Sequence, residues 1–139
     1  MKRTQWLAGS LLLALAACCE PQTQQAVPLR PLPEDAAPLT YAELLTRARY
    51  QERIAVESYY ADHWAELEDS ARGLQQTARF LAKAQDVPPN HKDTLPVVSG
   101  DLAKEADKLL EAAKAKDTKE VDAAMARVHA VVRSLKLEN

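Results

Sequence analysis

The sequence has few of the residues on which compact catalytic and metal sites often depend. It contains two cysteines, the neighbours Cys18 and Cys19, and three glycines, of which only Gly73 and Gly100 lie in the second half of the chain. Without further cysteines, the body of the chain has no disulfide, thiolate metal site or cysteine nucleophile. Without clustered glycines, it has no phosphate-binding loop of the usual form.

The sequence also lacks an excess of charge of one sign. Its 18 Lys and Arg residues and 20 Asp and Glu residues give a formal net charge of −2 at pH 7, and the two signs are interleaved. Interleaved charges are typical of solvated helix faces. Because no basic stripe is present to bind a phosphate backbone, we expect no nucleic-acid partner.

One short apolar run, from Leu7 to Ala17, follows the cations Lys2 and Arg3. This is the three-part layout of a secretory signal peptide. A helix that spans a bilayer needs about 20 consecutive apolar residues, so the run is too short for a permanent membrane span. The pattern predicts export of the chain.

The end of this run, Leu-Ala-Ala-Cys at 15–18, resembles the lipobox of bacterial lipoproteins. In that family a peptidase cuts before the cysteine after its thiol has been acylated. The resemblance implies a signal peptide over 1–17 and a lipid anchor, with palmitate among its acyl chains, on Cys18. Cys19 is the poorer acceptor, because its use would put Cys18 where a small residue is needed. Since Cys19 is not Asp, the family's sorting rule favours the outer membrane over the inner membrane, with the domain facing the periplasm.

Residues 18–39 are expected to form a flexible tether behind the lipidated cysteine. Proline has no N–H donor and blocks helix formation, so a proline-rich segment is extended and holds the folded part off the bilayer. The alternative to a lipid anchor is an ordinary cleavable signal with chance cysteines. Five prolines interrupt the segment: Pro21, Pro28, Pro31, Pro33 and Pro38.

The remainder, 40–139, predicts an all-α domain. Good helix formers dominate it, and no stretch alternates with the period of two that marks a strand. Apolar residues recur at spacings of three and four in four segments, which is the pattern of an up-down antiparallel four-helix bundle. Thr40 with Glu43, and Asp117 with Glu120, have the spacing of capping boxes at the first and last segments.

The first two segments, 40–60 and 62–85, are either separate helices or one long helix. Their apolar stripes are out of phase by one residue at Tyr59 and Tyr60, which is about 100° around a helix. A break with Asp62 as the cap of a new helix explains the shift. A continuous helix of about 65 Å explains it too, because no Gly or Pro stands there. Such a helix would overhang its neighbours and favour a homodimer.

No catalytic or metal motif is found in the sequence. A di-iron bundle needs Glu-x-x-His pairs, which do not occur, and no Ser-His-Asp order is suggested. We therefore expect neither an enzyme nor a metal site. Tyr59, Tyr60 and Trp64 either pack at the rim of the core or form a patch for a protein partner or a glycan. The three histidines are scattered along the chain: His63, His91 and His129.

The segment from Met125 to Arg133 resembles the last helix of the cytochrome c prime family. That helix carries Cys-x-x-Cys-His with Arg four residues after the His, and here His129 and Arg133 keep those places. Met125 and Val128 stand where the two cysteines belong. The resemblance implies a four-helix bundle, but without both thiols no haem is attached covalently. We expect a haem-free relative with no cofactor, in which His129 flanks the core or, as the one candidate, holds a non-covalent haem.

Three functions are compatible with these features. The first is an envelope lipoprotein whose bundle is a non-enzymatic binding or structural module with another envelope protein as partner. The second is a carrier of non-covalent haem or metal on the same bundle. The third is a periplasmic stress chaperone, because Leu39 to Glu43 loosely resembles the Leu-Thr-x-x-Gln motif of the Spy and CpxP group, with Glu43 in place of Gln.

Overall fold

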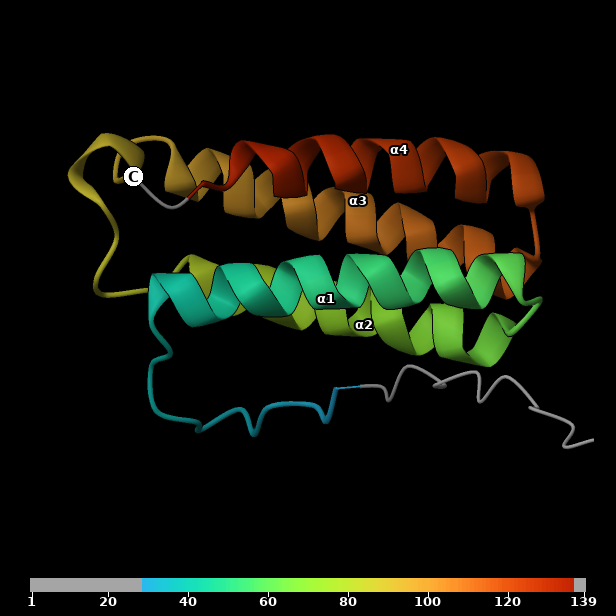
Figure 1. Cartoon of the computed structure of the whole chain (residues 1–139), viewed down its shortest axis with the longest axis horizontal. Coiled ribbons are helices and arrows are strands. Elements are labelled where there is room, and N and C mark those ends of the chain that lie inside the picture. Colours follow the sequence, from blue (N-terminus) through green and yellow to red (C-terminus); the bar gives the residue numbers. More distant parts are fainter. Residues whose placement is uncertain (1–28, 137–139) are drawn as a thin grey trace, which may run out of the picture.

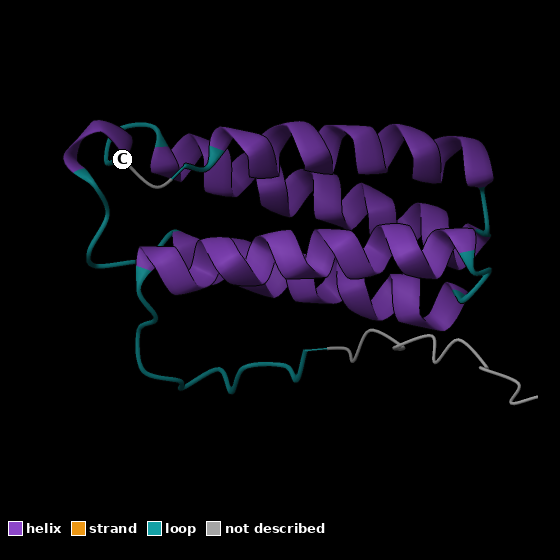
Figure 2. Ribbon diagram, viewed as in Figure 1, coloured by secondary structure: helices purple, strands orange, loops and turns teal. Residues whose placement is uncertain are grey.

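Four helices form an up-down antiparallel bundle in the computed structural model, which describes residues 29–136 (Figure 1). A single turn of 3-10 helix, η1, lies between the second and third helices. No strand occurs in this part of the chain (Figure 2), and the predicted all-α bundle is confirmed. The elements are α1 (Tyr41–Tyr60), α2 (Trp64–Leu81), η1 (Pro89–His91), α3 (Leu95–Ala115) and α4 (Thr118–Ser134).

The core is built from the apolar stripes of all four helices. Consecutive helices pack closely against each other, whereas α1 meets α4 less extensively. Each stripe removes its side chains from water only against the other helices, which is why no single helix is stable alone. Fully buried members include Leu44, Leu45, Leu67, Leu74, Leu102, Leu109, Val121 and Val128.

The chain reverses between α1 and α2 without a glycine or a proline. Asp62 adopts a left-handed backbone with φ of 60°, which Asp tolerates better than most residues. The N–H of His63 donates to the carbonyl of Ser58 at 2.8 Å, and the N–H of Asp62 donates to the carbonyl of Tyr59 at 3.1 Å. This pair of bonds is a Schellman motif, which ends a helix. The two helices are therefore separate, and the long overhanging helix is wrong.

Asp62 does not cap α2, contrary to the prediction. It ends α1, and its carboxylate accepts a hydrogen bond from Trp64 Nε1 at 2.5 Å. The N-cap of α2 is His63, whose side chain makes no capping hydrogen bond. Tyr60, the first residue of the predicted second stripe, is 80% exposed because it still belongs to α1, whose inward face passes through Ser58.

The predicted capping box of α1 is confirmed, and at α4 the Asp117 half of the predicted box is present. Thr40 Oγ1 accepts a hydrogen bond from the N–H of Glu43 at 3.2 Å, and the Glu43 carboxylate accepts one from the N–H of Thr40 at 2.9 Å. The carboxylate of Asp117 accepts from the N–H of Glu120 at 3.1 Å. These bonds satisfy main-chain donors that the first turn of each helix leaves without a partner.

A buried hydrogen bond joins α1 to α2. Thr77 Oγ1 donates to Gln51 Oε1 at 2.7 Å, and both side chains are buried. Gly73 provides the room, because a Cβ atom there would lie 2.5 Å from Gln51 Nε2. Gly100 on α3 faces open space instead. The glycine at 73 therefore allows a polar side chain to reach its partner inside the helix interface.

Glu105 connects α3 to α4. Its carboxylate accepts hydrogen bonds from Arg127 Nε at 2.6 Å and from Lys108 Nζ at 2.8 Å, and the residue is 9% exposed. Burial alone would raise the pKa of Glu105, but the hydrogen bonds and charges of Lys108 and Arg127 outweigh it. They hold the pKa of this carboxyl below its usual value.

Alanine at each glycine separates helix propensity from packing. We expect Gly100→Ala to raise the free energy of unfolding by about 0.5–1 kcal/mol, the usual gain in a helix interior. Gly73→Ala should not show this gain, because its methyl group would displace the Gln51 amide from Thr77. The gain should return in the Gln51→Ala background. Urea denaturation measures all four variants, and equal stabilisation at both glycines would contradict the close approach.

Glu105→Gln is expected to lower the free energy of unfolding by about 1–2 kcal/mol at neutral pH, because it removes a charge shared by two cations. The pKa of Glu105 is lower in the folded state than its ordinary value of 4.5, so the stabilisation is present above 4.5 and is lost as the pH falls through the folded value. The difference from wild type should therefore shrink in acid.

Urea denaturation at a series of pH values from about 7 to about 3 tests this dependence. Glu111→Gln is the matched control, because Glu111 meets only the exposed Lys114 and should change stability little. A pH-independent difference between Glu105→Gln and wild type would contradict the assignment.

Candidate functional site

Cys18, the residue with a predicted chemical role, lies outside the described residues, as does the predicted signal peptide 1–17. The structure bears on the bundle and on the last part of the expected tether, residues 29–39. Within residues 29–136, no helix combines the length and the apolar character needed to cross a bilayer.

His129 lies on the outer side of the seam between α1 and α4. Its side chain is 56% exposed, and Nδ1 makes a hydrogen bond with Glu52 Oε1 across the seam. A cavity lies in this seam, and both His129 and Met125 line it, as expected for residues four apart on one helix. His129 is therefore hydrogen-bonded at the flank of the core, as expected, but it is open to solvent. The cavity holds about 270 Å³, and its apolar lining is Ala55, Val56, Leu109, Met125, Ala126 and Val128.

The other two histidines lie in unrelated places. His63 Nδ1 is 3.3 Å from Glu66 Oε2 at the start of α2. His91 stacks on Tyr41, with 6.0 Å between the ring centroids. Over the range that the structure describes, no group of three or more His, Cys, Asp or Glu side chains converges to hold a metal ion.

The aromatic cluster divides between the core and the surface. Tyr59 and Trp64 pack against the core, edge to face with centroids 6.0 Å apart. The Tyr60 ring lies 5.5 Å from that of Tyr59 but projects into solvent beside the α1–α4 seam. Rim packing is therefore confirmed for Tyr59 and Trp64. A binding patch that includes Tyr60 stays a prediction.

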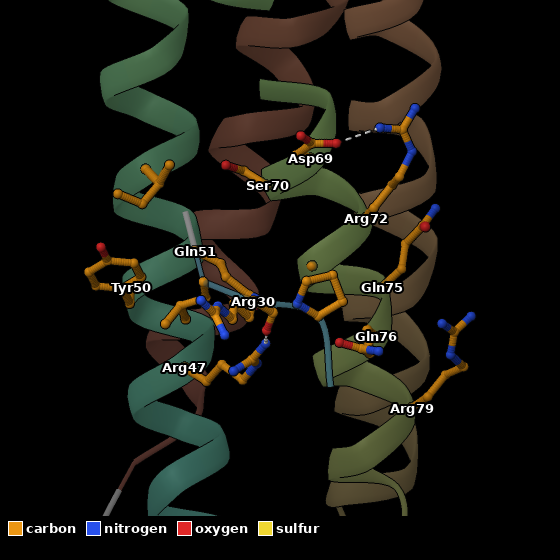
Figure 3. Close-up of a pocket in the computed structure, with 14 residues that line it drawn as sticks. Arg30, Arg47, Tyr50, Gln51, Asp69, Ser70, Arg72, Gln75, Gln76 and Arg79 are labelled. Atoms are coloured by element: carbon orange, nitrogen blue, oxygen red, sulfur yellow. Dashed lines mark hydrogen bonds and ion pairs between the residues drawn. The ribbon is translucent and has the colours of Figure 1, made fainter. Parts of the chain in front are cut away.

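A groove of about 560 Å³ lies between α1 and α2, and the chain's own tether borders it (Figure 3). The segment that precedes α1 turns back and runs along this side of the bundle (Figure 1). We call this surface the α1–α2 groove. It is lined by Arg47, Tyr50, Gln51 and Ile54 from α1, by Asp69, Ser70, Arg72, Gly73, Gln75, Gln76 and Arg79 from α2, and by Leu29, Arg30 and Pro31 from the tether.

Gln76 binds the main chain of the tether at Leu32. The N–H of Leu32 donates to Gln76 Oε1 at 2.8 Å, and Gln76 Nε2 donates to the carbonyl of Leu32 at 2.7 Å. A primary amide offers one acceptor and two donors, so it can satisfy both polar groups of one residue in an extended chain. The side chain of Gln76 thus pairs with the main chain of Leu32 through both polar groups, as a neighbouring β-strand would.

The groove also presents positive charge. Arg47 Nη2 donates to the carbonyl of Arg30 at 2.5 Å. Arg47 Nε is buried and finds no hydrogen-bond partner within residues 29–136, and burial lowers the pKa of this guanidinium. Arg72 is paired with Glu68 and Asp69, both at 2.8 Å. Arg79, at the lower edge in Figure 3, is exposed. The rim can therefore accept a carboxylate.

The α1–α2 groove was not predicted from the sequence. Tether residues up to 39 were expected to be free of the bundle, whereas Leu32 is half-buried and bonded to a residue 44 positions away. One feature could have drawn attention to it: Leu32 stands between Pro31 and Pro33 and so carries an isolated main-chain donor. Nothing in the helical pattern marks Gln76 as its partner.

Comparison with known proteins finds no relative for this chain. No family model matches it, and neither does a curated protein or a solved structure. The functional assignment therefore depends on the residues themselves.

Haemin should not bind tightly through His129. Positions 125 and 128 carry no thiol for covalent attachment, and the His129 side chain is 56% exposed instead of being enclosed by apolar side chains. Titration of the unlipidated chain with haemin should leave the Soret band where it is for free haemin. His129→Ala should behave like wild type, and a Soret shift that this substitution abolishes would overturn the haem-free interpretation.

Proposed function

We propose that this chain is a lipid-anchored lipoprotein of the bacterial cell envelope and that its bundle is a non-enzymatic binding module. Removal of 1–17 leaves Cys18 at the N-terminus, where its thiol carries the lipid. The domain faces the periplasm, from the outer membrane in preference to the inner membrane. The lipobox at 15–18 supports the anchor.

The observation that carries the binding role is the contact between Gln76 and the main chain of Leu32. A module that only fills space needs an apolar core and a polar surface. Here the surface also holds a side-chain amide aligned with both polar groups of an extended chain, beside a groove with exposed guanidinium groups. These are features that recognise a peptide.

We further propose that the chain is a haem-free relative of the cytochrome c prime family. The spacing of His129 and Arg133 and the four-helix order support this, and the loss of both thiols accounts for the absence of covalent haem. The haem-carrier alternative draws less support, since the His129 side chain is 56% exposed at the surface of the α1–α4 seam. The chaperone alternative also draws less support, because Thr40 and Glu43 of its motif form the cap of α1.

Cys18→Ser should abolish lipidation, because a hydroxyl cannot replace the thiol as acceptor. In cells fed radiolabelled palmitate, wild type should be labelled and recovered with membranes, and Cys18→Ser should be neither. Cys19→Ser is the matched control and should remain labelled and membrane-bound. Label retained in Cys18→Ser, or lost in Cys19→Ser, would refute the anchor at position 18. Density separation of the two membranes in the same cells tests the outer-membrane assignment.

A further inference from the structure

Within the Pro31–Leu32–Pro33 unit of the tether, one residue has a main-chain donor. Pro31 and Pro33 have no N–H, so across these three residues only Leu32 can donate a main-chain hydrogen bond. Gln76 accepts that bond and returns one to the carbonyl of the same residue. Gln76 therefore suits a Pro-x-Pro main chain, because its Oε1 accepts from the one N–H group that such a unit has.

The tether leaves much of the groove open. Leu29, Arg30 and Pro31 are exposed and form only one border of a space of about 560 Å³. Ile54 on α1 and Ser70 on α2 also line it. A longer or bulkier segment could fill this space and bury more apolar surface than the tether does.

The rim favours an acidic ligand. Arg47 has a buried Nε without a partner among the described residues, and Arg79 is exposed at the edge. In the tether itself the Pro-x-Pro unit is followed by the exposed acidic residues Glu34 and Asp35. Positive side chains at the groove and carboxylates after the proline unit are complementary in charge, which guides association and register.

We propose that the α1–α2 groove is a binding site for an extended Pro-x-Pro segment followed by carboxylates in another envelope protein, and that in the resting chain Leu29, Arg30 and Pro31 border it while Gln76 holds Leu32. This inference rests on the proposed role of the bundle as a binding module. The partner's segment takes the place of the tether: its central N–H and carbonyl pair with Gln76, a carbonyl accepts from Arg47, and its carboxylates meet the guanidinium rim.

Displacement of the tether would change the reach of the domain from the membrane. While Gln76 holds Leu32, residues 32–39 run back along the bundle and add nothing to its distance from the lipid. Once Leu32 is released, these residues add about 25 Å of extended chain at about 3 Å per residue. Binding of the partner would thereby be coupled to a longer leash.

The tether competes from the same chain, at an effective concentration on the order of millimolar. Weakening the tether must therefore strengthen binding of an added segment. The substitution Leu32→Pro removes the N–H that Gln76 accepts and leaves the lining of the groove intact. The probe is a synthetic peptide with the sequence Leu-Arg-Pro-Leu-Pro-Glu-Asp, which corresponds to residues 29–35.

Fluorescence anisotropy of the labelled peptide measures its Kd for residues 18–139 prepared without lipid, which keep every described residue. We expect Leu32→Pro to bind the peptide at least about tenfold more tightly than wild type. Adding Gln76→Ala should abolish binding. Adding Gln85→Ala should not, because Gln85 is exposed and lies outside the lining of the groove. Circular dichroism checks that each variant remains helical.

Solvent exchange of the Leu32 amide, measured by NMR, provides a second readout. In wild type this amide should be protected, and both Gln76→Ala and an excess of peptide should bring its exchange to the rate of a free amide. Equal affinity of wild type and Leu32→Pro, binding retained in helical Gln76→Ala, or an unprotected Leu32 amide would overturn the groove as a peptide site. The palmitate result for Cys18 is independent of these outcomes, so failure of the groove and failure of the anchor are distinguishable.

Discussion

The reversal at Asp62 is the constraint on which the arrangement of the bundle depends. A left-handed residue other than glycine costs about 1–2 kcal/mol. Two main-chain hydrogen bonds of the Schellman motif and the Asp62–Trp64 contact offset this cost. A larger stabilisation comes from apolar burial, because the turn places α2 antiparallel to α1 and brings their two apolar stripes together. Everything on the α1–α2 face follows from that turn.

The same interface accommodates a buried polar pair and a surface groove. Gly73 lets the Gln51 amide reach Thr77, and both Gly73 and Gln51 also line the α1–α2 groove. A larger residue at 73 would therefore act on the interior hydrogen bond and on the floor of the groove together. The glycine that makes room for Gln51 is thus also part of the groove that we propose as a peptide site.

The bundle is held differently on its other sides. A carboxylate with two cationic partners joins α3 to α4 at Glu105, in a site that is nearly closed to water. The α1–α4 seam is joined at its surface by Glu52 and His129 and encloses a small cavity. Both hollows thus lie along α1, one on each side. His129, which suggested haem chemistry in the sequence, is in the structure an exposed side chain that is hydrogen-bonded to Glu52.

The sequence by itself determined the helical class and the caps at Thr40 and Asp117, because these depend on local spacing and on residues within one turn. It also contains the segment at 15–18 that resembles a lipobox, which is a linear pattern. It could not choose between one long helix and two, since the left-handed turn at Asp62 is favourable only once α2 packs on α1. Nor could it pair Leu32 with Gln76, because a contact across 44 residues exists only after the bundle has placed both on one face. Local sequence specifies the helices and their caps, and tertiary packing decides which of their surfaces are in contact.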